Sequence, residues 1–232
     1  EDVYVTQPPG FELKGHVDKV MKLKKALYGL KQAPRAWNVK LDRSLANLGF
    51  SRCPLEYAVY KRVRNGSLIL VGVYVDDLII TGSNLEGISE FKIQMQNCFR
   101  MSDLGLLSYY LGIEVHQSKA GICLNQSNYA RKILKELGMD ECNASETPME
   151  ERLKLSKKSK GKPLDTTMYR GIVGSLRYLT HTRQDLSFTV GIVSRFIEAP
   201  TIEHLTVIKR ILRYIKGTLN YGLMFAKSEK FE

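Results

Sequence analysis

Two adjacent carboxylates, Asp76 and Asp77, are the side chains of this sequence best suited to chemistry. They lie within residues 68–82, LILVGVYVDDLIITG, between two apolar runs rich in β-branched residues. Each run has the composition and length of a buried strand, so the segment predicts a hairpin with both acids at its tip. Carboxylates in that position suit hard divalent cations and two-metal phosphoryl or nucleotidyl transfer. An ordinary turn, where Asp is common, is the alternative interpretation.

The elements that must position these acids follow from periodicity and turn residues. A helix is expected from Pro34 to about residue 48, because apolar residues recur at helical spacing and Gly49 follows. Asn65-Gly66 between apolar runs is a strong hairpin signal. We expect strands at 57–63 and 68–75, a helix at 85–99, extended segments at 106–115 and 121–124, and helices at 125–137, 166–181, 184–198 and 201–216.

The order of these elements predicts an α+β fold. Strands with interspersed helices come first, and an all-helical end follows as a separate subdomain. Residues 1–20 contain Pro8-Pro9-Gly10 and are expected to form no regular element. Residues 143–165 are polar, basic and punctuated by prolines, and they predict a linker.

Composition limits the class of protein. The 232 residues allow one sizeable domain or two smaller ones, and 44% hydrophobic with 25% charged residues is typical of a soluble globular protein. No apolar run could span a bilayer and no signal-peptide pattern is present, so we expect neither a membrane protein nor a secreted one. The four cysteines are dispersed and form no CxxC pair, which favours a reducing intracellular setting. The four histidines lack ligand spacing and are expected to have surface or hydrogen-bonded roles.

The net charge of +11 favours a polyanionic partner. Nucleic acid is the first expectation and an anionic membrane surface the second, while a solubility bias is the alternative. The basic residues gather in two regions, at Lys22, Lys24, Lys25, Lys31 and Arg35, and at Lys154, Lys157, Lys158, Lys160 and Lys162.

Four motifs in order resemble the reverse transcriptase of copia-type retrotransposons: ALYGLKQAPRAW (26–37), VYVDDLIITG (73–82), YLGIEV (110–115) and YRGIVGSLRYL (169–179). The resemblance runs nearly from end to end. It implies a right-hand polymerase, with partial fingers and palm over 1–117 and a helical thumb with a connecting region over 118–232. It also implies an RNA-directed DNA polymerase that uses two magnesium ions to add deoxynucleotides to a primer 3′-hydroxyl.

The resemblance assigns the chemistry to particular residues. Asp76 matches the carboxylate that binds magnesium, and Asp77 matches its partner. Tyr74 and Val75 would lie near the primer terminus. Gln32 matches a glutamine of the nucleotide pocket, where its neutral donor and acceptor suit a sugar.

Further residues are expected to bind nucleic acid. Lys31 and Arg35 offer phosphate contacts, with a solvated helix face as the alternative for each. Trp37, on the apolar face of the same helix, is expected in the core.

Two more motifs match parts that hold the primer. Leu111 and Gly112 match the primer grip, a hairpin in which glycine allows close approach of the backbone. Gly174 and Tyr178 lie four residues apart and match the thumb helix in the minor groove of the template–primer duplex. The alternatives are an ordinary strand bulge for Gly112 and helix–helix packing for the second pair.

The family's third catalytic carboxylate lies upstream of the opening EDVYVTQPPGF, so we expect the chain to be a fragment. Neither Asp2 nor Asp18 is a substitute, and no acidic cluster of the ribonuclease H type is present. The alternative function is therefore a catalytically incomplete remnant that binds nucleic acid, and a third is a relic without a stable fold. Expected partners are an RNA/DNA template–primer duplex, deoxynucleoside triphosphates and the rest of a Pol polyprotein, including integrase and ribonuclease H, in a cytoplasmic virus-like particle.

Overall fold

The computed structural model describes residues 2–157 and 161–227. The chain divides into two compact units, residues 1–105 and 106–232, which we call unit 1 and unit 2. Each unit has its own cluster of buried apolar side chains. Both contain helices and strands, so the predicted α+β class is confirmed. The expected boundary at residue 117 concerns polymerase subdomains and stays a prediction.

Unit 1 is built on an antiparallel sheet with strand order β3-β4-β5-β6. Asn65 and Gly66 have φ values of 50° and 75° and join β4 to β5, as an Asn-Gly turn predicts. The strands are β3 (Ser51–Arg52), β4 (Val59–Arg64), β5 (Ser67–Tyr74) and β6 (Asp77–Gly82). The two strands β4 and β5 were therefore predicted from the sequence to within two residues at each end.

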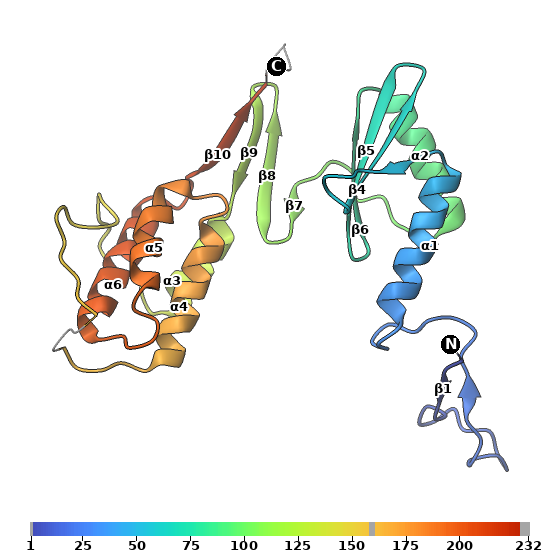
Figure 1. The fold of residues 1–232 in the computed structure, drawn as a ribbon, viewed down its shortest axis with the longest axis horizontal. Coiled ribbons are helices and arrows are strands. Elements are labelled where there is room, and N and C mark those ends of the chain that lie inside the picture. Colours follow the sequence, from blue (N-terminus) through green and yellow to red (C-terminus); the bar gives the residue numbers. More distant parts are fainter. Residues whose placement is uncertain (1, 158–160, 228–232) are drawn as a thin grey trace. The chain divides into compact units, whose positions relative to one another are not determined.

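Two helices of unit 1, α1 (Ala33–Asn47) and α2 (Leu85–Cys98), lie beside this sheet (Figure 1). Gly49, with a φ of 83°, follows the end of α1 as predicted. The Asn84 side chain caps α2 by accepting a hydrogen bond from the Glu86 amide at 2.8 Å. Both helices bury their apolar residues against one face of the sheet, in a core of Leu41, Leu45, Phe50, Tyr60, Ile69, Val71, Phe91, Met95 and Phe99.

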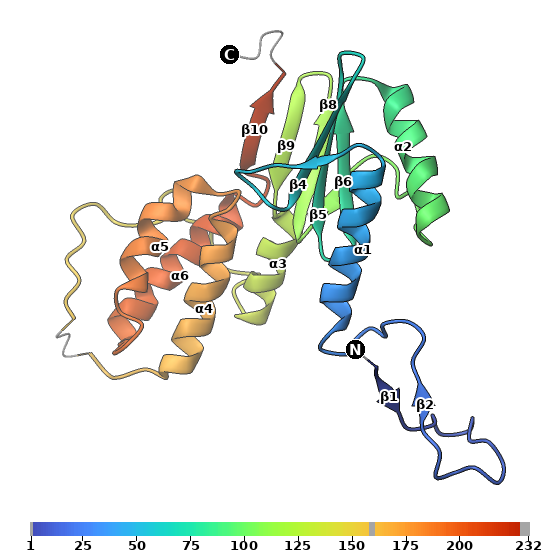
Figure 2. The same ribbon diagram turned by 45° about the vertical axis from the view of Figure 1, so that its right-hand side comes forward.

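The N-terminal segment contains two short strands that the sequence did not predict. β1 (Tyr4–Val5) pairs with β2 (Met21–Lys22), and Figure 2 shows this hairpin before α1. The expectation of no regular element in residues 1–20 was therefore wrong for β1. Pro8-Pro9-Gly10 prevents regular secondary structure only in the loop between the two strands. The side chain of Gln7 stabilises this loop by donating to the carbonyl groups of His16 and Lys19.

Unit 2 also contains an antiparallel sheet, with strand order β10-β9-β8-β7. Its strands are β7 (Tyr109–Tyr110), β8 (Ile113–Ser118), β9 (Gly121–Asn125) and β10 (Gly222–Ala226). The expected all-helical end was wrong, because β10 returns to pair with β9. A methyl group on Gly222 would lie 2.2 Å from the Leu124 carbonyl oxygen, so glycine permits this close pairing.

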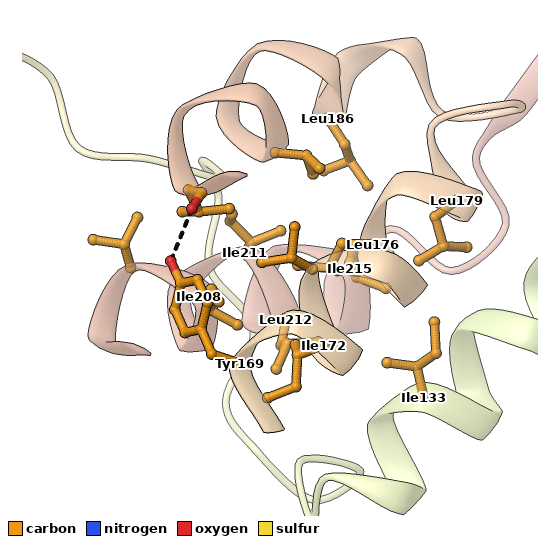
Figure 3. Close-up of a cluster of buried hydrophobic side chains, with 14 of the residues drawn as sticks. Ile133, Tyr169, Ile172, Leu176, Leu179, Leu186, Ile208, Ile211, Leu212 and Ile215 are labelled. Atoms are coloured by element: carbon orange, nitrogen blue, oxygen red, sulfur yellow. Dashed lines mark hydrogen bonds between the residues drawn. The ribbon is translucent and has the colours of Figure 1, made fainter. Parts of the chain in front are cut away.

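The helices of unit 2 surround its hydrophobic core (Figure 3). Tyr169 lies within this core, where its hydroxyl donates to the Val193 carbonyl at 3.0 Å and burial raises its pKa to about 12. The helices are α3 (Ser127–Glu136), α4 (Thr166–Leu179), α5 (Ser187–Ser194) and α6 (Ile202–Gly217). The helix expected at 184–198 is shorter, because its first residues form a 3-10 turn and α5 ends at Ser194. Phe196, just beyond that end, stacks on buried His204.

A buried arginine ties the start of α5 to the end of α6. The side chain of Arg183 is 3% exposed and forms a two-pronged ion pair with Asp185, at 2.8 and 3.0 Å. It also donates to the Thr218 carbonyl at 3.0 Å. Burial by itself raises the pKa of Asp185, but the hydrogen bonds and charge of Arg183 outweigh burial and lower the pKa.

The expected linker at 143–165 is fastened to α6. Arg210 donates to Glu150 at 2.9 Å, and Arg213 donates to the Asn143 carbonyl at 2.7 Å. The described part of this segment contains no helix, and its one isolated bridge joins Pro163 to Thr201. Two lysines of the second basic region, Lys158 and Lys160, lie outside the described residues.

Candidate functional site

The acidic pair lies at the tip of the β5–β6 hairpin, as the sequence predicted. Tyr74 pairs with Asp77 to close the hairpin, and Val75 and Asp76 form the two-residue turn. The side chains of Asp76 and Asp77 are exposed, and so are those of Tyr74 and Val75. The strands thus present two carboxylates to solvent on a rigid support.

The turn holds an unusual backbone conformation. Val75 has a φ of 53°, in the left-handed region that a β-branched residue rarely adopts. Such a conformation costs about 1–3 kcal/mol and persists only where the surrounding structure holds it in place. One such support is present, because the indole nitrogen of Trp37 donates to the Val75 carbonyl at 2.6 Å.

Trp37 was expected to be a core residue, and the structure adds a second role. Its ring packs edge-on against Phe99, with 5.1 Å between the ring centroids, and is partly buried. Its N–H group reaches a turn 38 residues further along the chain. Helical spacing predicted the packing, but no local pattern in the sequence could reveal that hydrogen bond.

The donor set at the turn fits part of a magnesium site. Carboxylate oxygens are ligands that magnesium accepts, and it commonly retains water on its remaining positions. Within residues 2–157 and 161–227, no group of three His, Cys, Asp or Glu side chains could hold a metal ion. Asp2 forms an ion pair with Lys22 at 2.7 Å, in the N-terminal hairpin. Asp76 and Asp77 therefore provide two carboxylates, and a complete site needs further ligands.

A strongly basic cavity lies against α1. Its volume is about 670 Å³, and Gln32 and Arg35, both predicted as ligand-binding residues, line it. Lys31 is exposed but is not among the lining residues. Of the described residues that line the cavity, five are cationic and none is acidic: Lys24, Lys25, Arg35, Lys40 and Arg43.

Gln32 lies immediately before α1, where two of the first three helical residues offer no free N–H group, because Ala33 donates to the Leu30 carbonyl at 3.0 Å and Pro34 has no N–H. Its side-chain amide caps none of the described backbone groups of that helix. Lys40 and Arg43 were missed as candidate residues. Ala36, Val39, Lys40 and Arg43 recur at spacings of three and four residues, so the sequence could have placed Lys40 and Arg43 on one face of the helix.

The predicted primer-grip residues form a second tight turn. Tyr110 pairs with Ile113, and Leu111 and Gly112 between them have φ values of 49° and 80°. A methyl group on Gly112 would lie 2.5 Å from the hydroxyl oxygen of Tyr178. Tyr178 also donates a hydrogen bond to the Leu111 carbonyl. The structure thus brings together three residues that were predicted from two separate motifs.

Gly174 lies on the exposed side of α4. Apart from its own helix, no described heavy atom lies within 4 Å of a methyl group built on it, and the same holds for Gly171. Gly171 was missed, although its three-residue spacing from Gly174 was a usable signal. Glycine costs about 1 kcal/mol relative to alanine inside a helix. Two such residues without internal packing leave a helix surface that another molecule can approach closely.

No helix in the described part of the chain is long and apolar enough to cross a membrane. This finding concerns helices of the described residues alone.

Comparison with known proteins identifies the family. Residues 1–151 match the family model of reverse transcriptase (RNA-dependent DNA polymerase). The Retrovirus-related Pol polyprotein from transposon RE1 of Arabidopsis thaliana is 43% identical over 227 residues, which cover 98% of this chain and 16% of that protein. The corresponding polyprotein from transposon TNT 1-94 of Nicotiana tabacum is 37% identical over 240 residues, covering 99% of this chain and 18% of that protein.

This chain therefore spans less than a fifth of the length of these relatives. No solved structure matches it significantly. The family model covers more than half of the chain, and the four motifs lie within a region aligned nearly end to end with the polyproteins. The chain belongs to the reverse transcriptase (RNA-dependent DNA polymerase) family, as its resemblance to the copia-type enzymes implied.

Proposed function

We propose that this chain supplies the catalytic hairpin and the primer-holding elements of an RNA-directed DNA polymerase. The observation that carries the proposal is the exposed Asp76-Asp77 pair at the tip of a supported hairpin, in a chain of the reverse transcriptase family. In this proposal residues 1–117 correspond to partial fingers and palm, and residues 118–232 correspond to the thumb with a connecting region. This assignment makes the molecule part of a right-hand polymerase.

Asp76 and Asp77 would hold magnesium at the turn. When bound, the metal would lower the pKa of a primer 3′-hydroxyl and neutralise charge on the leaving pyrophosphate. Tyr74 and Val75, which flank the acids on the exposed side of the hairpin, would lie against the primer terminus or the incoming nucleotide. Gln32 would donate to and accept from the nucleotide sugar.

The template–primer duplex would contact both units. Arg35 and the other cationic residues of the basic cavity suit phosphate groups, and Lys31 adds a nearby exposed charge. The exposed glycine surface of α4 allows a minor groove to approach the backbone around Gly174. The turn at Leu111 and Gly112 would hold the last primer nucleotides.

The wider setting is proposed from the relatives. Their names describe Pol polyproteins of transposons. We therefore propose that integrase and ribonuclease H regions act with this chain, in a cytoplasmic virus-like particle.

Primer extension in the full-length protein that carries this chain tests the proposal. The wild type should extend a primer on RNA with magnesium, and Asp76→Asn should reduce synthesis by at least about 1,000-fold, because a neutral amide loses most of the metal's binding energy. Asp103→Asn is the matched control, since Asp103 is a carboxylate of unit 1 that pairs with Lys92 at 2.9 Å. Undiminished synthesis by Asp76→Asn would contradict the catalytic assignment.

A binding module without catalysis is the second candidate function. The observation that favours it is that no third acidic side chain joins Asp76 and Asp77 within the described residues. A wild type that binds duplex in a salt-dependent way, yet extends no primer with magnesium or manganese, would support this second function over the first.

A further inference from the structure

Two hairpin turns in this protein share the same backbone conformation and the same kind of side-chain hydrogen bond. In each, the first turn residue is not glycine and has a left-handed φ: 53° at Val75 and 49° at Leu111. In each, an aromatic side chain on a helix donates a hydrogen bond to the carbonyl of that residue. Trp37 of α1 binds Val75, and Tyr178 of α4 binds Leu111.

A hydrogen bond to a carbonyl fixes the peptide plane to which the carbonyl belongs. The Val75 carbonyl lies in the plane that joins Val75 to Asp76, so Trp37 controls the orientation of the backbone that carries the first acid. The Leu111 carbonyl lies in the plane that joins Leu111 to Gly112. Tyr178 therefore controls the second turn, where its hydroxyl also fills the space a Gly112 side chain would need.

Both aromatic donors are themselves held in place. Trp37 packs edge-on against Phe99, and Tyr178 packs edge-on against Tyr129 with 4.9 Å between ring centroids. Such edge-to-face contacts favour one orientation of each ring. The donors can therefore transmit the position of a helix to a turn.

The turn between β4 and β5 offers a contrast. Asn65 also has a left-handed φ, of 50°, and Gly66 follows it. Asparagine tolerates this region far better than valine or leucine. Within the described hydrogen bonds, no side chain donates to the carbonyl of either residue. Among the described hairpin turns, aromatic donors are thus found at the two that place valine or leucine in the left-handed region, and both turns carry predicted functional residues.

We propose that Trp37 and Tyr178 are positioning residues, which hold the Val75–Asp76 and Leu111–Gly112 peptide planes in the geometry needed for nucleotide addition. The part of this inference that concerns nucleotide addition rests on the proposed polymerase function. Stabilisation of the two turns by these hydrogen bonds does not depend on that function, and it can be measured without an activity assay.

Trp37→Phe and Tyr178→Phe test it, because each removes one donor and keeps an aromatic ring. Tyr169→Phe is the matched control: it lies on α4 like Tyr178, and its hydroxyl also donates to a backbone carbonyl, but to that of Val193. All variants are made in the full-length protein. Hydrogen exchange of peptides covering each turn is measured together with single-turnover incorporation and filter-binding affinity for a template–primer duplex.

We expect each donor variant to accelerate exchange in its own turn several-fold and to leave exchange around Asn65-Gly66 unchanged. Incorporation should slow about ten-fold, with duplex affinity within about two-fold of wild type, because the reacting groups are misplaced while the binding surface remains. Tyr169→Phe should change neither turn exchange nor incorporation. If Trp37→Phe does not fold, Phe99→Leu serves instead, since it removes the ring that orients Trp37 and leaves the N–H group.

Each result that differs from these expectations contradicts one particular part of the proposal. Unchanged exchange in the turns overturns the inference, whatever the activity. Faster exchange with unchanged incorporation overturns the positioning role but leaves the polymerase function intact. Weaker duplex binding by Tyr178→Phe at an unchanged incorporation rate would make Tyr178 a contact residue. An inactive wild type contradicts the proposed function, and the inference then fails as a statement about nucleotide addition, while exchange still reports whether the donors hold the turns.

Discussion

At Gly112 the backbone and a neighbouring side chain compete for the same space. The residue has a φ of 80°, and a methyl group there would meet the Tyr178 hydroxyl oxygen at 2.5 Å. The next nearest atom of that ring, Cζ, would lie at 3.4 Å, which is close to ordinary contact. Two separate costs therefore apply to any larger residue, one from backbone strain and one from the hydroxyl.

Gly112→Ala should lower the free energy of unfolding by about 1–3 kcal/mol, because it adds both costs. The double variant Gly112→Ala/Tyr178→Phe should recover the part that comes from the clash, while the strain remains. A double-mutant cycle from urea unfolding measures this coupling. Gly174→Ala is the control: its methyl group meets open space, so it should stabilise α4 by about 0.5–1 kcal/mol. Additive costs in the cycle would rule out the clash.

At the scale of elements, α1 packs into the core with one face and lines the basic cavity with another. One face buries Leu41 and Leu45 in the core of unit 1, and another presents Arg35, Lys40 and Arg43 to the basic cavity. The same helix therefore fixes a basic surface relative to the sheet that carries the acids.

Lys40→Gln/Arg43→Gln should weaken binding to template–primer duplex and lower the free energy of unfolding by no more than about 1 kcal/mol, since the Lys40 ammonium lies over the Phe99 ring, 4.9 Å from its centroid. The slope of log affinity against log salt should fall by about one for each phosphate group that the variant no longer binds. Filter binding over a salt series measures it. Lys132→Gln/Lys135→Gln on α3 removes equal charge outside the cavity and is the control. Equal slopes for both double variants would mean that only net charge matters.

Local elements were largely predictable from the sequence. Helical spacing identified α1, and Asn65-Gly66 identified the β4–β5 hairpin, because both signals lie within a few neighbouring residues. The tip of the β5–β6 hairpin followed from two apolar runs around two acids. Pairing of β10 with β9 was missed, since the paired residues lie 97 to 105 positions apart and neither strand alone determines the other.

The candidate site shows the same limit. Residue types and motifs led to Asp76, Asp77, Leu111 and Gly112, and the structure places each pair in or directly beside a tight turn. The hydrogen bonds that support those turns join residues 38 and 67 positions apart. Contacts of that kind depend on tertiary packing and leave no periodic trace in the sequence.

At the scale of the whole molecule, each unit has a core that shares no residue with the other. Fully buried side chains such as Leu45 in unit 1 and Leu176 in unit 2 mark these cores. This organisation argues against a relic without a stable fold, since each cluster joins helices to one another or to a sheet.

Leu176→Ala should destabilise unit 2 by about 2–5 kcal/mol, because it leaves a cavity at a site with 0% exposure. Hydrogen exchange should then rise in α3 to α6 and stay unchanged in β4 to β6. Leu45→Ala is the reciprocal variant and should loosen unit 1 alone. Loss of protection in both units from either substitution would show that the two cores unfold as one.

Trp37 is the one tryptophan among the 232 residues, and its indole N–H group is bound to the backbone beside Asp76. Indole emission responds to hydrogen bonding and to nearby charge. The chain thus contains a built-in optical reporter at its acidic turn, one that needs no label. Titration with magnesium or with a nucleotide can be followed by that signal alone, and rearrangement of the turn can be timed in a stopped-flow instrument before any bond is made.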